Sequence, residues 1–386
     1  MAIEITSRSL AGMPDKTASH KERQRLPPTA AEKRISRSLR LAPRVMRRNF
    51  SSRAPELSGG KAIILSIPKS GRTWIRTFVY AYFCKRYGRE FTLEPEHYDE
   101  PGIPRLIFSH DLFEHRTKGD LWDRIRGKYL VPKKELRRAK IILLVRDPRD
   151  CFVSLYVQMT RRDPGAPAEF KRKTVSELLR DKEFGIRAIV RTMNAWLNEF
   201  SGRDDFTIIR YESLREAPAE NFRYLLAFLD ETAPDMSSFQ DALDFSRFDN
   251  MQRLEAAGAF DSKILRPGDI RDPESFKVRR GKIGGYREYL SAEDQEYAAD
   301  ALTKLDSRFG YDPRQNTPPQ FPRGYLELAA RGCFDPQPAI DVVQVQLRAG
   351  REVAAPLKRV VLRAHAILRR GLTGAARQRG HGEPGD

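Results

Sequence analysis

Cysteine is scarce in this sequence: three residues stand among 386, at positions 84, 151 and 333. No two of them have the short spacing of a metal-ligand pair, which argues against a disulfide framework and against a zinc site. No apolar run reaches the roughly 18–20 residues of a membrane span. The N-terminus also lacks the apolar core of a secretory signal. We therefore expect a soluble, cytoplasmic protein without a metal.

Acidic residues are scarce at both ends of the chain. Residues 1–60 hold 13 Lys and Arg against 5 Asp and Glu, and residues 314–386 hold 12 against 6. Of the net charge of +18, only +4 remains for residues 61–313, which is the charge of an ordinary enzyme that handles an anion. Nucleic-acid binding would explain the basic ends but not the ordered motifs between them, so we expect no nucleic-acid partner.

Composition divides the chain into three parts. Residues 1–58 are rich in Ser, Pro, Arg and Lys, and they predict a basic, disordered extension ahead of a folded domain at residues 59–313. Residues 314–386 begin as a proline-rich linker and continue as a basic amphipathic helix over 342–372. The helix is predicted to pack on the domain or on a protein partner. The alternative is that the basic ends contact a membrane surface. A short amphipathic stretch at residues 35–50 also indicates this alternative.

One stretch organises the folded part. Residues 61–67 are an apolar run rich in β-branched residues, Pro68 and Gly71 interrupt it, and apolar residues at helical spacing continue to Tyr87. This pattern predicts strand, tight loop and helix, a geometry whose N–H groups and positive helix end bind phosphate. The loop is not a Walker A motif, because Lys69 precedes the glycine and no upstream glycine stands at the required distance.

Three further apolar runs predict strands, at residues 103–110, 139–146 and 206–211. The second of these is unbroken, as in strands buried on both faces of a parallel sheet. The predicted fold class is therefore α/β, a three-layer α/β/α domain with a central, mainly parallel sheet. His110 and Arg146 stand at the carboxyl ends of two strands, where ligands bind such sheets, and Ser154 lies on the next helix. They are a candidate base and a candidate anion-binding pair.

A cation-rich run with three glycines occupies residues 276–286 and predicts a flexible basic clamp over an anionic ligand. A last helix, at residues 291–309, is predicted to close the domain. Ligand pockets are commonly built from connecting loops. We expect these loops at residues 88–102, 111–135, 161–173 and 252–275.

In order and spacing, four motifs resemble those of the sulfotransferases that use 3′-phosphoadenosine 5′-phosphosulfate (PAPS), over about residues 60–312. The first is Pro-Lys-Ser-Gly-x-Thr-Trp at residues 68–74, and the second is the apolar strand that ends in Arg146, with Ser154 eight residues on. The third is Tyr-Glu-x-Leu at residues 211–214. The fourth, Arg-Lys-Gly-x-x-Gly-x-aromatic, corresponds to residues 279–286. Each motif alone is a weak signal, whereas four in this order are a strong one.

The resemblance implies a role for each matching residue. It places Lys69, His110 and Ser154 in the catalytic group, with Lys69 at the leaving oxygen and His110 as the base. The positions that it implies for donor binding are Lys69, Ser70, Gly71, Arg72, Thr73, Trp74, Arg146, Ser154, Tyr211, Ser246, Phe248, Arg279, Arg280 and Gly281.

Three residues depart from the family pattern. Arg72 replaces a small hydroxyl residue that is common in the phosphate loop, which adds a cation there. Phe108 stands two residues before His110, where relatives that act on small phenols and alcohols often carry a lysine. Tyr286 replaces the usual tryptophan. The second departure weakens any inference to the substrates of those relatives.

The resemblance implies an enzyme, a PAPS-dependent sulfotransferase. It would transfer a sulfuryl group from PAPS, in line and without a metal, to a hydroxyl or amine of a small-molecule or glycan acceptor. The polar loops favour a sugar or another polar acceptor over a flat phenol. Two alternatives stay open. A P-loop nucleotide kinase-like enzyme should show a Walker A loop and an acidic strand end for magnesium. A catalytically weak, sulfotransferase-like binding protein would use the basic tails for membrane or partner contact.

Overall fold

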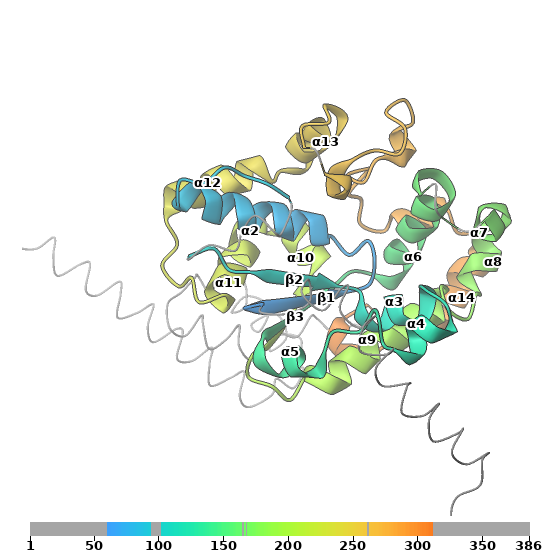
Figure 1. Ribbon diagram of the computed structural model, residues 1–386. Helices are drawn as coiled ribbons and strands as arrows, with labels where there is room; N and C mark the ends of the chain where they lie inside the picture. The colour runs from blue at the N-terminus through green and yellow to red at the C-terminus, as the bar shows by residue number, and fades with distance from the viewer. Residues whose placement is uncertain (1–59, 94–101, 164–165, 167, 261, 312–386) are drawn as a thin grey trace, which may run out of the picture. The chain divides into compact units, whose positions relative to one another are not determined.

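The computed structural model describes residues 60–93, 102–163, 166, 168–260 and 262–311 (Figure 1). The predicted N-terminal extension, the amphipathic stretch at 35–50 and the C-terminal linker and helix lie outside the described residues. Within the described ranges, no helix combines the length and the apolar character that crossing a membrane requires.

A four-stranded sheet forms the centre of the described part. Its strands are β1 (Ala62–Ser66), β2 (Leu106–Ser109), β3 (Lys140–Val145) and β4 (Phe206–Arg210). They pair in the order β2-β1-β3-β4, and all three pairings are parallel, as predicted. Every residue of β1 is buried, because helices cover both faces of a parallel sheet and its strands must be apolar on both sides.

Helices on one face pack through aromatic side chains. This layer contains α2 (Arg72–Arg86), α11 (Pro218–Phe228) and α12 (Met236–Phe245), which share a buried cluster with Ile64 of β1. The rings of Phe78 and Phe222 stack with their centroids 3.8 Å apart, and Phe239 meets Phe78 edge-on. Aromatic rings at helical spacing on α2 therefore provide the surface that fixes this helix, and the loop before it, against the sheet.

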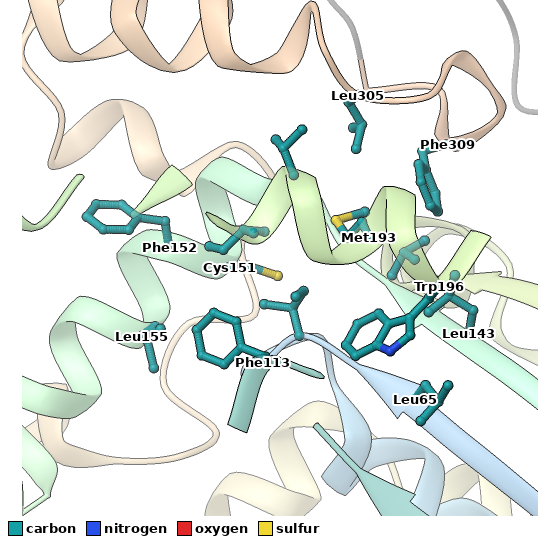
Figure 2. Packing of buried hydrophobic residues seen from close by; sticks show 14 of the residues in the cluster. Leu65, Phe113, Leu143, Cys151, Phe152, Leu155, Met193, Trp196, Leu305 and Phe309 are labelled. Carbon is teal, nitrogen blue, oxygen red and sulfur yellow. The ribbon is translucent and has the colours of Figure 1, made fainter. Parts of the chain in front are cut away.

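The opposite face carries α3 (Asp111–Thr117), α6 (Pro148–Val157), α9 (Ile186–Phe200) and α14 (Ala292–Leu302). Figure 2 shows Trp196 of α9 beside Leu65 and Leu143, which point from the sheet into this second core. Pro148 stands in the first turn of α6, where its missing N–H costs nothing. The predicted three-layer α/β/α fold is confirmed.

The sequence-based expectations differ from the structure in the connections. Residues 111–135, expected as a loop, fold largely into α3, α4 and α5, and the helix expected over 291–309 ends at Leu302, before a separate 3₁₀ turn. Helices of five to seven residues are too short to show an apolar period, and α4 depends on a cap, in which Asp120 Oδ1 accepts from the Asp123 N–H.

The remaining helices are α4 (Leu121–Ile125), α5 (Lys133–Arg138), α7 (Ala168–Arg172), α8 (Val175–Leu179), α10 (Tyr211–Glu216) and α13 (Phe248–Ala256). The short turns are a π turn, η2 (Gln158–Arg162), and the 3₁₀ turns η3 (Lys263–Leu265), η4 (Pro273–Ser275), η5 (Gly285–Glu288) and η6 (Ser307–Phe309).

Candidate active site

The loop between β1 and α2 has two residues with positive φ, separated by Ser70. Lys69 has φ 75° and Gly71, the residue before α2, has φ 100°. No side chain caps this end of α2, and its first turn holds no acidic residue. The positive end of a fifteen-residue helix is therefore open to an anion from outside the helix, as the sequence predicted for a phosphate loop.

Gly71 is required here for two separable reasons. Its φ lies in the left-handed region, which costs a residue with a Cβ about 1–2 kcal/mol, and an added Cβ would stand 2.8 Å from Tyr211 Cδ2. We expect Gly71→Ala to lower the thermal midpoint by several degrees and to impair binding of an adenine nucleotide, because Tyr211 must move. Thermal unfolding and calorimetry measure both effects.

Two glycines provide the controls for that substitution. Gly88 has φ 62° but open space around it, so Gly88→Ala reports backbone strain alone. Gly202 has open space and no positive φ, so Gly202→Ala should change neither property. Nucleotide binding in Gly71→Ala that matches the Gly88→Ala value would show that the contact with Tyr211 does not matter.

A cavity of about 730 Å³ opens at the carboxyl edge of the sheet. The sheet register explains why distant residues meet there: Leu65 pairs with Ser109, Ser66 with Leu144, and Val145 with Arg210. The residues that follow each strand are consequently neighbours in space. The predicted site residues that line the cavity are Lys69, Gly71, Arg72, Thr73, Trp74, His110, Arg146, Ser154, Tyr211, Ser246, Phe248, Arg279, Arg280 and Gly281.

Ser70 is the predicted site residue that does not line the cavity. Its side chain is buried, and its hydroxyl lies 3.4 Å from the Cys151 thiol on α6. The side chain therefore joins the phosphate loop to the helix that follows β3, and any contact of residue 70 with a ligand would have to come from its backbone.

Lys69 is half-buried in a positively charged environment. Burial is the main cause that lowers the pKa of its ammonium to about 7, and the charges of Arg162 and Arg146 lower it further, against the opposing effect of Glu255. A lysine with this pKa is charged in about half of the molecules at neutral pH. A bound anion would restore the charge.

His110 directly follows β2 and is buried. Its Nδ1 lies 2.6 Å from the Ser66 carbonyl oxygen, and because a carbonyl can only accept, Nδ1 carries the proton and Nε2 keeps a lone pair. Burial first, and then the charge of Arg72, lower the pKa of His110 well below its usual value. His110 is thus a neutral imidazole with one basic nitrogen at physiological pH, the form that a general base needs.

Asp111 fixes the turn that presents His110. Its φ is 33°, its N–H donates to Ser109 Oγ at 2.9 Å, and its carboxylate accepts from the Val131 N–H at 2.8 Å. These contacts tie the end of β2 to the segment before α5, and they hold a backbone conformation that is unfavourable for a non-glycine residue.

Arg146 connects three parts of the cavity wall. Its guanidinium donates to the Lys69 carbonyl at 3.2 Å and to the Lys282 carbonyl at 3.0 Å, and it lies 4.4 Å from the centroid of the Tyr211 ring. Asp150, in the first turn of α6, accepts from the Gly284 N–H at 2.8 Å. The junction between β3 and α6 therefore positions the phosphate loop and the glycine-rich segment together.

The predicted clamp at residues 276–286 is tied down by ion pairs in this structure. Arg279 pairs with Glu274 at 2.5 Å and also contacts the Tyr289 hydroxyl. Arg280 pairs with Glu274 at 2.8 Å and with Glu288 at 2.6 Å. The cations expected to hold a phosphate therefore already have carboxylate partners.

Aromatic rings form another wall. Trp74 meets Tyr211 edge-on with ring centroids 6.0 Å apart, and Phe248 lines the same cavity. Gly281 approaches Phe248 so closely that a Cβ would stand 2.6 Å from its ring. Ser246, buried beside them, donates to the Leu243 carbonyl at 3.3 Å. Flat apolar surfaces next to a cationic edge suit a purine nucleotide.

Six cations that line the cavity were not predicted as site residues: Arg76, Lys118, Arg162, Arg215, Lys277 and Lys282. Arg76 stands one helical turn after Arg72 and stacks on Phe108, with 4.2 Å between the guanidinium carbon and the ring centroid. The i, i+4 spacing of the two arginines could have indicated a shared helix face. Arg162 ends the π turn and falls in the predicted pocket loop 161–173, and Lys277 falls in the predicted clamp at residues 276–286, but no local pattern places either beside Lys69.

Together, the parallel sheet, the loop before α2 and the lining residues define an α/β protein with a cationic cavity at the carboxyl edge of its sheet. The sequence model described as "Sulfotransferase domain" matches residues 60–310. The chain belongs to the sulfotransferase domain family.

Curated relatives are similar at low identity. Human sulfotransferase 2B1 is 24% identical over 257 residues, which cover 60% of this chain and 62% of the relative. Cytosolic sulfotransferase 12 of Arabidopsis thaliana is 22% identical over 261 residues, covering 61% of this chain and 74% of the relative. The chain thus spans somewhat less than two thirds of the length of the human protein.

The solved structures that match this chain include mouse sulfotransferase SULT7A1 complexed with PAP, at 16% identity and a TM-score of 0.43. That likeness covers 66% of this chain and 85% of the mouse chain. Retinol dehydratase in a complex with retinol and PAP has 16% identity and a TM-score of 0.46, over 67% of this chain and 87% of that chain.

Proposed function

We propose that this protein is a PAPS-dependent sulfotransferase that acts on a hydroxyl or amine of a polar small molecule or glycan. One observation carries the proposal: Lys69, His110 and Arg146, which follow three different strands, line one cavity. Membership of the family agrees with it. An isolated phosphate loop would not need a neutral, oriented histidine beside it.

The donor-binding roles follow from the chemistry of the walls. Arg146, Ser154, Arg279 and Arg280 offer charge-assisted contacts to a 3′-phosphate, and the loop at Lys69–Thr73 offers them to the 5′-phosphosulfate. Trp74, Tyr211 and Phe248 supply apolar surface for the adenine. These residues fit a 3′,5′-bisphosphorylated adenine nucleotide. We propose no metal ion for the reaction.

The proposed reaction forms a bond between the acceptor oxygen or nitrogen and sulfur, while the bond between sulfur and the 5′-phosphate oxygen breaks. His110 Nε2 would take the proton of the acceptor, since its Nδ1 is committed to Ser66. Lys69 would neutralise, or protonate, the departing phosphate oxygen. The rate enhancement then comes mainly from positioning and from charge stabilisation, as in phosphoryl transfer.

Arg146→Ala tests the donor site. Loss of a charge-assisted contact is worth about 1.5–3 kcal/mol, so affinity for PAP should fall tenfold or more, and the preference for PAP over adenosine 5′-phosphate should shrink. Calorimetric titration of both nucleotides, with ATP beside them, measures this. A variant that keeps its full preference for the 3′-phosphate would refute the assignment of Arg146.

Arg149 provides a matched control for that experiment. It lies three residues along the chain, pairs with Asp147 at 2.7 Å and stacks on Tyr286 with 4.4 Å to the ring centroid. Arg149→Ala should leave the ratio of the two affinities unchanged, because this arginine does not line the cavity.

For the chain as a whole, we propose a cytoplasmic enzyme whose catalytic domain spans residues 59–313. Its basic ends, residues 1–58 and 314–386, would contact a protein partner or a membrane surface rather than nucleic acid. This part of the proposal depends on composition alone.

A further inference from the structure

The cavity has more positive charge than the proposed donor needs. Among the described residues, eleven Lys and Arg side chains line it, against four Asp and Glu. A nucleotide with two phosphates and one sulfuryl group carries roughly four negative charges near neutral pH, since a phosphate monoester contributes about two. A donor alone therefore leaves a positive surplus in the cavity.

Part of the surplus lies near Lys69, because the charges of Lys69, Arg76 and Arg162 all act on Lys277. Three of the four acids pair with other cations of the wall: Glu114 with Lys118 at 2.8 Å, Asp150 with Arg146 at 3.8 Å, and Glu288 with Arg280 at 2.6 Å. We call Arg76, Arg162 and Lys277 the acceptor-side cations. The fourth acid, Asp163, directly follows Arg162.

Arg162 and Lys277 are positioned by main-chain carbonyls. Arg162 donates to the Arg266 carbonyl at 3.2 Å, and Lys277 Nζ donates to the Ile264 carbonyl at 2.5 Å. These bonds fix the side chains but do not offset their charges, because a carbonyl has no net charge. The carboxylates of Glu255 and Asp163 favour the charged form of Arg162, although burial lowers its pKa overall. Each group also keeps further N–H donors for a ligand.

One buried carboxylate stands behind this group. Glu255 is fully buried and accepts from the N–H groups of Lys277 and Val278, at 2.7 and 2.8 Å. Even with that acid nearby, burial and the charges of Lys69, Arg162, Arg72 and Arg76 lower the pKa of Lys277 well below its usual value. Positive groups held this close to one another favour the binding of an additional anion.

We propose that the acceptor is itself an anion: a hydroxyl- or amine-bearing molecule with a carboxylate, phosphate or sulfate group that Arg76, Arg162 and Lys277 bind beside His110. This inference depends on the proposed function, because it names the second substrate of that reaction. Arg76 stacks on Phe108, two residues before His110, with 4.2 Å between the guanidinium carbon and the ring centroid. A cation thus stands near that position from a different element, α2.

The test uses pairs of acceptors that differ in one charged group, with full-length protein saturated with PAP. The pairs are 4-hydroxybenzoate with 4-hydroxybenzamide, and glucose 6-phosphate with glucose. Calorimetry gives the affinity of each compound, and transfer of label from PAPS gives its turnover. In at least one pair, we expect the anionic member to bind tenfold tighter or more, and to be the better acceptor.

Variants assign the effect to the named cations. Arg76→Gln and Lys277→Met should each reduce the ratio of affinities to about threefold or less. Arg76→Gln keeps the hydrogen bond between Lys277 and the Ile264 carbonyl, so this variant still tests the proposal if the Lys277→Met variant does not fold. Lys85→Met removes the same charge from an exposed position on α2, where Lys85 pairs with Asp241 at 2.9 Å, and it should keep the full ratio.

The outcomes separate this inference from the function on which it depends. If PAP binds but the neutral members bind equally well, if no probe binds, or if both variants keep the full ratio, the anionic acceptor is wrong and the donor site stands. If PAP itself does not bind, the proposed function fails, and this inference fails with it.

Discussion

Lys69→Met should lower the rate of sulfuryl transfer by about 10²–10³-fold, the usual effect of removing one group that stabilises charge in a transition state. Affinity for PAP should fall by much less, because the other cations of the donor site remain. Single-turnover transfer from labelled PAPS and calorimetry with PAP separate the two effects. The same Lys85→Met variant controls for the loss of one positive charge. A variant with near-normal turnover would show that Lys69 does not act on the leaving group.

The lowered pKa of Lys69 adds a pH signature. With a pKa of about 7 in the unliganded protein, Lys69 is mostly charged at pH 6 and mostly neutral at pH 8. A bound anion favours the charged form, so binding of PAP should take up close to no proton at pH 6 and up to one proton at pH 8. Calorimetry in two buffers with different ionisation enthalpies measures the uptake. Uptake that persists in Lys69→Met would assign the proton to another group, such as Lys277.

His110→Ala should reduce transfer by about 10²–10⁴-fold, while affinity for PAP stays within a few-fold, because the base acts on the acceptor and not on the donor. Since the alanine leaves the Ser66 carbonyl without its partner, His110→Asn should be measured in parallel. His115→Ala is the control, because His115 lies on the same helix, α3, and does not line the cavity.

The pH dependence of catalysis gives a second test of His110. A base is active above its pKa and loses activity as the pH falls through it. Because the pKa of His110 is well below its usual value of 6.5, the acid limb of kcat/KM should lie below pH 6.5. An acid limb at or above pH 6.5 that disappears in His110→Asn would contradict the burial seen here. Unchanged activity in His110→Ala would mean that another group, or none, removes the proton.

The strands and the residues that follow them could be predicted because their signals are local. Strands β1 and β3 are unbroken apolar runs, and a parallel sheet brings their carboxyl ends to one edge, so the sequence alone was enough to place Lys69, His110 and Arg146 together. The phosphate loop was recognisable for the same reason, since its order of Lys, Gly and hydroxyl residues lies within one short stretch.

Other features depend on contacts between distant segments. Arg162 reaches the cavity because the π turn bends the chain after α6, and Lys277 because Ile264 and Glu255 hold it there. The sequence predicts a flexible clamp at residues 276–286. In the structure, the ion pairs of Arg279 and Arg280 with Glu274 and Glu288 hold the segment in place. Ser70 stands within a recognisable motif, yet its side chain serves the packing against Cys151.

Glu274 and Glu288 are counter-ions of Arg279 and Arg280 within the proposed nucleotide site. A phosphate that arrives at Arg279 and Arg280 exchanges places with carboxylates of the protein, and dissolved chloride has little part in the exchange. The affinity should therefore depend less steeply on ionic strength than the number of basic residues suggests. When the nucleotide leaves, the carboxylates pair with the arginines again. This lowers the free energy needed to release a highly charged product.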